Sequence, residues 1–232
     1  MTSPTRIALS ILAGAGLLAA REPAAAQAAK PTVAIMYFNN NVFTKDARDY
    51  DGLTKGVPDF LVSEMSSNPN IRVIERDQVQ KLIDEQKLTS GGQVDRETAV
   101  RVGKLLGAQH MIFGGFMADP KGNFRIDARA VNVESGAIEY TDRVQDKADD
   151  VMALIAQLAA RLNSGLKLGA PARTGDAGTR IPMRVAVLYG KALDMADKGD
   201  NAKAIELFGA VLREFPNYAP AKSGLAKVKP GG

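Results

Sequence analysis

Three consecutive strand-like runs in the middle of the chain constrain its fold most. They are residues 109–118, 123–133 and 137–145, joined by the short turn segments DPKG and ESG. In the second run, apolar and charged residues alternate from Phe124 to Arg129, which predicts one buried face and one exposed face. The alternation breaks at Ala130 and Val131, where we expect a β-bulge. The runs therefore predict an antiparallel meander.

Strands and helices alternate before this meander. The expected strands are residues 32–38 and 71–75, and the expected helices follow residues 56, 77 and 95, with a further helix over 149–166. Pro58 is tolerated in the first turn of a helix, so we expect its helix to begin near Gly56. Asp77 and Asp95 are expected N-caps, and Gly107 an expected left-handed stop. The order β-α-β-α-α-β-β-β-α predicts an α/β fold with a mixed sheet and flanking helices.

The N-terminus has the pattern of a secretory signal peptide over residues 1–28. Arg6 precedes an apolar run, and small residues at Ala26 and Ala28 predict cleavage after Ala28. A membrane anchor is the alternative, but the apolar run is short for a bilayer. The chain has no cysteine, so neither a disulfide nor a lipid on an N-terminal cysteine is expected. We expect an exported protein, periplasmic or associated with the outer membrane.

The remaining chain divides into an α/β domain over 29–167, a linker over 168–182 and a helical unit over 183–232. The linker is rich in Gly, Ala and Pro and lacks periodicity. The helical unit has the small, aromatic and proline spacing of a tetratricopeptide repeat, at Leu188, Ala192, Gly199, Ala204, Phe208 and Pro216. An ordinary helical hairpin that ends at a proline is the alternative.

A single repeat of this kind has an apolar face that it cannot bury alone. One side of the helix pair is covered by the helix predicted over 219–228, and the other exposes Leu188, Leu193 and Met195. Two outcomes are open, docking onto the α/β domain or binding to a neighbour or partner. The long linker favours the second. These three residues are therefore our candidate partner-binding residues.

The net charge of +4 arises mainly in the tail, because residues 182–232 carry 8 basic and 5 acidic side chains. Such an excess on solvated helices is weak evidence for nucleic acid, so no nucleic-acid partner is expected.

Four carboxylates in one short stretch raise the possibility of acid–base chemistry: Glu75, Asp77, Asp84 and Glu85. Asp84 and Glu85 are adjacent in a predicted helix, so they point about 100° apart. Lys81 stands four residues from both Asp77 and Glu85, which is typical of a solvated helix face. Glu75 and Arg76 at a strand end have no evident partner. We therefore expect no catalytic site, no enzyme activity and no cofactor.

Metal binding has little support in the sequence. His110 is the only histidine and there is no cysteine, so a typical zinc site is not expected. The segment DYDG at 49–52 resembles the start of a calcium loop, but Ala47 and Pro58 stand at its first and last ligand positions. A looser ion or ligand site in the 39–52 loop remains open.

Several ordered segments carry a resemblance to a known family. "KGVPDFLVSEM", "VIERDQVQKLIDEQKL", "VRVGKLLGAQHMIFGGF" and "ARAVNVESGAI" resemble the curli production assembly/transport component family, CsgG, over residues 32–166. The resemblance implies a CsgG/TolB-N-like fold and no enzyme activity. Pore-forming members insert long hairpins, whereas "MADPKGN" between Phe116 and Phe124 is shorter than one membrane strand of about 9–11 residues. The resemblance is thus to a domain without pore hairpins.

We expect an exported, non-enzymatic CsgG-like adaptor for envelope assembly or secretion. Its partners would be envelope proteins, with a weak homo-oligomer possible and no direct insertion into the membrane. A periplasmic sensor that binds a ligand or ion through the 39–52 loop is the alternative of a different class.

Overall fold

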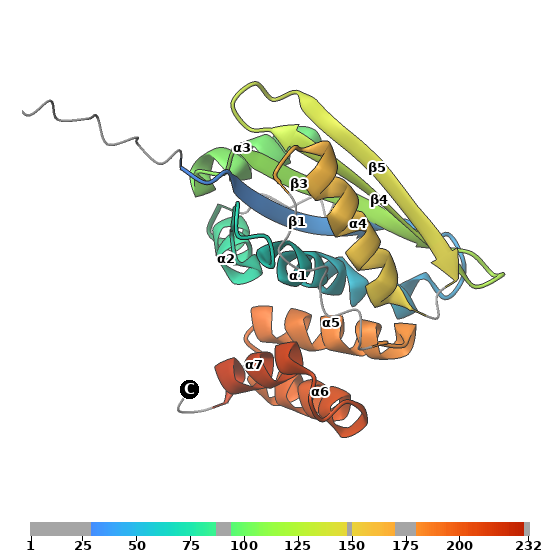
Figure 1. Ribbon diagram of the computed structural model, residues 1–232. Helices are drawn as coiled ribbons and strands as arrows, with labels where there is room; N and C mark the ends of the chain where they lie inside the picture. Colours follow the sequence, from blue (N-terminus) through green and yellow to red (C-terminus); the bar gives the residue numbers. More distant parts are fainter. Residues whose placement is uncertain (1–28, 87–93, 148–149, 170–179, 230–232) are drawn as a thin grey trace, which may run out of the picture.

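The computed structural model describes residues 29–86, 94–147, 150–169 and 180–229. The predicted signal peptide and most of the predicted linker lie outside these ranges. The described strands form one five-stranded sheet in the order β2-β1-β3-β4-β5 (Figure 1). They are β1 Thr32–Asn40, β2 Arg72–Val73, β3 His110–Ala118, β4 Asn123–Asn132 and β5 Ile138–Lys147.

The sheet is mixed, as the sequence predicts. Strand β1 runs parallel to both β2 and β3, and β3, β4 and β5 form an antiparallel meander. The register between β4 and β5 shifts between Ala130 and Val131, which confirms the expected irregularity. The two turns of the meander contain Gly122 and Gly136 with φ of 77° and 70°, values that glycine adopts without strain.

Helices cover both faces of the sheet. They are the short helix η1 Ala47–Tyr50, then α1 Leu53–Ser66, α2 Arg76–Gln86, α3 Arg96–Leu106 and α4 Val151–Gly165. Helices α1 and α4 share one hydrophobic cluster with one face of the sheet, and α2 and α3 share a second cluster with the other. The core therefore has two parts, one on each side of β1 and β3.

Two predicted helix starts are wrong and one is confirmed. Helix α1 begins at Leu53, before the predicted Gly56, because the turn ahead of Pro58 already forms through bonds to the Gly52 carbonyl. Asp77 lies inside α2, whose first N–H groups donate to the Glu75 carbonyl. Asp95 does cap α3, since it accepts the Thr98 N–H at 2.8 Å, and Gly107 ends it with φ of 65°.

Three more helices form a helical unit that packs on the outer side of α1 (Figure 1). They are α5 Met183–Asp197, α6 Asn201–Glu214 and α7 Ala219–Val228. Buried residues of α5 and α6 belong to the same hydrophobic cluster as α1 and the sheet. The helical unit is thus docked onto the α/β domain, and the expectation of a tail that leaves the domain to bind elsewhere is wrong.

Helices α1 and α5 approach each other backbone to backbone at a glycine pair. A Cβ added to Gly190 would lie 1.8 Å from the Gly52 carbonyl oxygen, and one added to Gly52 would lie 2.2 Å from the Val187 carbonyl oxygen. A Cβ at either position would force the backbone of one helix to move, so only glycine fits at this crossing. The glycine pair sets how closely the helical unit can dock.

Replacing Gly190 by alanine should therefore separate α5 from α1. We expect Gly190→Ala to destabilise the protein by about 2–3 kcal/mol through overpacking. The control is Gly209→Ala in α6, where a Cβ would meet only the Arg213 side chain at 3.9 Å. That change should leave stability unchanged or raise it by about 0.5–1 kcal/mol. Urea unfolding of both variants tests this, and equal effects would contradict the role of the crossing.

Candidate functional site: a charged cleft between α2 and the helical unit

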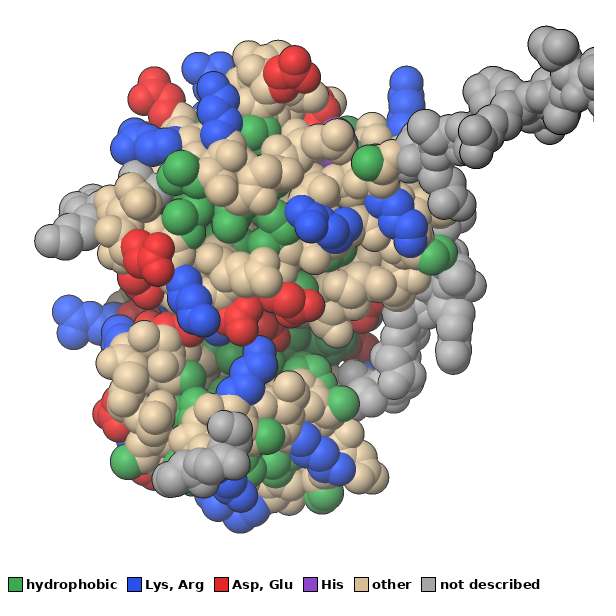
Figure 2. Space-filling model, turned by 90° about the vertical axis from the view of Figure 1, so that its left-hand side faces the viewer, with side chains coloured by type: hydrophobic (Ala, Val, Ile, Leu, Met, Phe, Trp, Pro, Cys, Tyr) green, Lys and Arg blue, Asp and Glu red, His purple; other side chains and the backbone are tan. Residues whose placement is uncertain are grey.

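A cleft of about 650 Å³ lies where α1 and α2 face the helical unit. Figure 2 shows this side of the molecule, with acidic side chains gathered between an upper and a lower lobe. The apolar part of its lining includes Val62, Leu193, Ala196, Phe208, Pro220 and Val228. The charged part consists of Asp59, Glu75, Arg76, Asp77, Lys81, Asp84, Asp197 and Lys227. We call this the inter-helix cleft.

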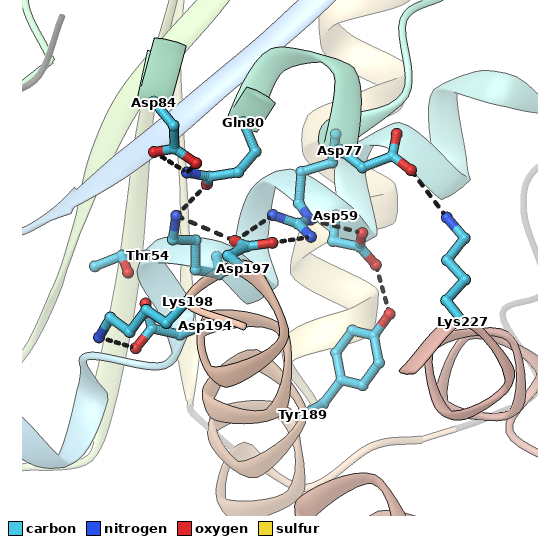
Figure 3. Close-up of polar contacts among 12 residues, drawn as sticks. Thr54, Asp59, Asp77, Gln80, Asp84, Tyr189, Asp194, Asp197, Lys198 and Lys227 are labelled. Carbon is cyan, nitrogen blue, oxygen red and sulfur yellow. Dashed lines mark hydrogen bonds and ion pairs between the residues drawn. The ribbon is translucent and has the colours of Figure 1, made fainter. Parts of the chain in front are cut away.

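The Arg76 guanidinium joins three helices at the inner wall of the cleft. Figure 3 labels its two carboxylate partners, Asp59 and Asp197. Its Nη1 and Nη2 donate to the two carboxylate oxygens of Asp197 on α5, at 2.8 and 3.0 Å. Its Nε donates to Asp59 on α1 at 3.3 Å. The paired fork on Asp197 fixes both distance and orientation, so α2 and α5 can meet in only one register.

Lys55 of α1 is a second cation in the same network. Its ammonium group lies 3.3 Å from the Asp197 carboxylate and donates to the side-chain oxygen of Gln80, Oε1. It also lies 3.7 Å from the centre of the Tyr37 ring. The Gln80 amide nitrogen in turn donates to both oxygens of Asp84 at 2.8 Å. The network therefore extends from buried Asp197 to the exposed mouth of the cleft.

Tyr189 of α5 joins the charged network to the hydrophobic core. Its hydroxyl donates to Asp59 at 2.6 Å, and its ring stacks on Phe60 of α1 with centroids 5.4 Å apart. The same ring contacts Phe208 at 5.9 Å and Tyr218 at 5.5 Å. One side chain of α5 thus contacts α1, α6 and the residue that precedes α7.

Burial shifts several pKa values in the network. Desolvation raises the pKa of Asp59, although the Tyr189 hydroxyl and the Arg76 charge partly offset it. Desolvation lowers the pKa of Lys55, against the opposing charge of Asp197. Burial alone would lower the pKa of Arg76, but its bonds to Asp197 outweigh burial and leave the pKa above its ordinary value. The pKa of Tyr189 is raised by burial and by Asp59.

The outer rim of the cleft is less fully paired. Lys227 of α7 reaches across to Asp77 of α2 at 3.1 Å, and Figure 3 shows this bridge. Burial tends to raise the pKa of Asp77, but the Lys227 contact outweighs it and leaves that pKa lowered. Within the described part of the chain, Glu75 and Asp84 have no cation within ion-pair distance, and Lys81 has no carboxylate. The pairs expected between Lys81 and Asp77 or Glu85 are therefore absent from the described residues.

The two cations of the inner wall are held by carboxylates, and the one histidine lies elsewhere, with His110 Nδ1 2.5 Å from Glu139. Among the described residues no three His, Asp or Glu side chains form a possible metal cluster, and no helix is long and apolar enough to cross a membrane. In the 39–52 loop, the Asn40 amide donates to Asp51 and to the Ala47 carbonyl, both at 2.8 Å.

The structure separates the three candidate partner-binding residues, which all lie on α5. Leu193 is buried and lines the inter-helix cleft. Leu188 and Met195 are half-buried, pack against the hydrophobic cluster and do not line the cleft. Of the three residues, only Leu193 thus lies at the cleft between α1 and the helical unit.

Sequence reasoning missed Tyr189 and Asp197 as members of the site, and it left Arg76 without a partner. A signal did exist for Asp197, because an acidic residue in the last turn of a helix is unfavourable there unless a cation is near. Nothing in the local pattern identifies that cation, which lies 121 residues earlier in the chain.

Comparison with known proteins supports the family resemblance. Residues 17–121 match the family described as curli production assembly/transport component CsgG. Within the described structure this segment runs from β1 to the turn between β3 and β4, and it excludes the helical unit. No curated protein matches the sequence.

Solved structures show distant likenesses. The C-terminal domain of LpoB from Salmonella enterica is 12% identical with a TM-score of 0.37, over 51% of this chain and 84% of that domain. TolB from Acinetobacter baumannii is 10% identical with a TM-score of 0.40, over 59% of this chain and 28% of TolB. The PelC dodecamer from Paraburkholderia phytofirmans is 11% identical with a TM-score of 0.36, over 59% of this chain and 89% of PelC. These values are too low to bear on function.

Removing the Arg76 side-chain charge should destabilise the docked state strongly. We expect Arg76→Met to cost about 3–5 kcal/mol, because Asp59 and Asp197 then stay buried with too few cations. Adding Asp197→Asn to that variant should recover part of the loss. The control is Arg184→Met, which breaks an exposed fork with Glu214 at 2.6 and 2.5 Å and should change the urea midpoint little.

The raised pKa of Asp59 predicts a specific pH dependence. A carboxyl group whose pKa is higher in the folded state favours folding while it is protonated, and this contribution is lost as pH rises from its ordinary value of 3.8 through its folded pKa. The substitution Asp59→Asn removes the carboxyl group that titrates. The free energy of unfolding of the wild type minus that of Asp59→Asn should therefore fall as pH increases from about 4 towards neutrality. Thermal unfolding across this range measures it, and a difference that rises with pH would contradict the assignment.

Proposed function

Because residues 17–121 match the CsgG family, we propose that this chain is an exported, non-enzymatic accessory protein of the cell envelope. It acts in assembly or secretion through protein–protein contacts, in the periplasm or at the outer membrane. The helical unit serves as a tetratricopeptide-like module that helps to build the binding surface, with no cofactor involved.

The inter-helix cleft is the observation that carries this proposal. Its volume of about 650 Å³ lies within the range of about 300–1,000 Å³ typical of binding pockets. It lies between the family-matched domain and the helical unit, and its inner wall is held rigid by the Arg76 network. A preformed cleft of this kind loses little conformational entropy when a partner segment enters it.

The chemistry of the lining indicates what kind of segment fits. The lining carries five carboxylates (Asp59, Glu75, Asp77, Asp84 and Asp197) and three cations (Arg76, Lys81 and Lys227). Among the described residues, Glu75 and Asp84 at the mouth have no cation within ion-pair distance, and Val62 and Val228 add apolar surface to the lining. The partner segment therefore carries a Lys or Arg next to an apolar anchor, so that charge and apolar surface are matched together.

Site-specific photocrosslinking in the native envelope tests this. A photoreactive residue at Ser223, which lines the cleft, should crosslink a discrete partner, and one at exposed Arg213 on α6 should not. Charge reversal at the mouth, Glu75→Lys with Asp84→Lys, should lower the crosslink about tenfold or more while circular dichroism stays unchanged.

The control pair is Glu206→Lys with Glu214→Lys, which makes the same charge change on α6. An equal loss of crosslinking in this pair would show that net charge, and not the cleft, governs capture. Full crosslinking in the cleft variant would refute the cleft as the partner site.

A further inference from the structure

None of the described helices covers one face of β4 and β5. Along β4, Phe124, Ile126 and Ala128 point into the cluster that α4 shares, so the residues between them point to the opposite side. The second cluster, formed with α2 and α3, includes Val131 and Val133 near the end of β4 but no residue of β5. The uncovered residues, which we call the open sheet face, are Arg125, Asp127, Arg129, Thr141, Arg143 and Gln145.

Two arginines on the open sheet face are aligned by one carboxylate. Arg125 Nε donates to Asp127 Oδ2 at 2.7 Å, and Arg143 Nε donates to Asp127 Oδ1 at 2.8 Å. Because both contacts use Nε, the terminal Nη groups of both guanidiniums have no partner among the described residues. Asp127 thus holds two guanidinium forks in place while leaving most of their donors available.

Arg129 adds a third cation to the same face. It is exposed, stands two residues from Asp127 along β4 and lies opposite Thr141 of β5. No described residue forms a hydrogen bond or ion pair with its side chain. The face therefore carries three arginines against one aspartate, with arginines on β4 spaced by about 13 Å, four residues of an extended strand.

A shallow hollow lies at one end of the open sheet face. It measures about 150 Å³ and is lined by Arg125 and Gln145 of the face together with Met117, Ala118, Asp119 and Asn123. Among the described residues, Asp119 forms no ion pair with Arg125; its oxygens accept the N–H groups of Lys121 and Asn123 and the Asn123 side chain, at 2.7–3.0 Å. These backbone bonds also lower the pKa of Asp119.

The free edge of β5 is a poorer docking site than the face. In its middle, the Arg143 N–H donates to the Asp142 side chain at 2.7 Å, and its carbonyl accepts from Arg161 at 3.2 Å. An added strand would have to displace both contacts.

We propose that the open sheet face binds a carboxylate-rich, extended segment of a partner protein. Guanidinium forks match carboxylates in bidentate geometry, and the alternate residues of an extended segment point to one side with a repeat of about 7 Å, as the arginine and aspartate positions of β4 do. This surface attracts acidic segments, whereas the inter-helix cleft attracts basic ones. The chain therefore presents two docking surfaces of opposite charge preference.

Fluorescence anisotropy with a labelled decapeptide of alternating Glu and Ser tests the proposal on the full mature chain. The peptide should bind, and its Gln–Ser counterpart should not. Arg129→Glu and Arg143→Glu should each weaken binding about tenfold or more. Arg213→Glu on α6 makes the same charge change at an exposed site away from the sheet and should have little effect. Equal weakening by all three variants, or no binding of the Glu–Ser peptide, would overturn the proposal.

A charge-preserving substitution separates fork recognition from general attraction. Arg143→Lys keeps the charge but loses the planar fork, so we expect binding to weaken about threefold or more. Unchanged binding in this variant would overturn recognition by the guanidinium forks. A second arm uses vesicles with and without phosphatidylglycerol. Arg129-dependent binding to the anionic vesicles without binding to the peptide would assign the face to a membrane and overturn the protein partner.

Discussion

The Arg76 guanidinium is the constraint on which the rest of this side of the molecule depends. It comes from α2, and its two carboxylate partners come from α1 and α5. A charge this deeply placed is costly unless it is fully paired, so the three helices can come together only when all three side chains meet. Buried ion pairs of this kind add little net stability compared with apolar packing, but they penalise every other arrangement. The shape of the inter-helix cleft follows from that selection.

Backbone packing and charge pairing act on the same interface. The contact of Gly52 with Gly190 allows α1 and α5 to approach until their main chains touch. That approach brings the Tyr189 hydroxyl onto Asp59 and the Asp197 carboxylate onto Arg76. A wider separation would leave charges in an apolar interface without partners, so the two features are effective only together.

The sequence predicted local structure far better than it predicted which residues meet. Periodicity was sufficient for the meander, the irregularity at Ala130, the Asp95 cap and the mixed sheet, because each depends on neighbours along the chain. The helical unit was recognised as apolar on one side, but spacing alone does not say what covers that side. Arg76 and Asp197 are 121 residues apart, and no periodic pattern connects residues across such a distance. The candidate site depends on such a pairing and therefore became visible only in three dimensions.

The glycine crossing has a consequence for how this chain can change over evolutionary time. Any substitution at Gly190 meets the carbonyl of Gly52, so single replacements at either position are disfavoured on steric grounds alone. A lineage that discarded the helical unit would release Gly52 from this restriction and would at the same time leave Arg76 without Asp197. In descendants that lack the helical unit, both Gly52 and Arg76 should therefore be replaced by other residues. A chain that retains this glycine and this arginine should still dock a helix there.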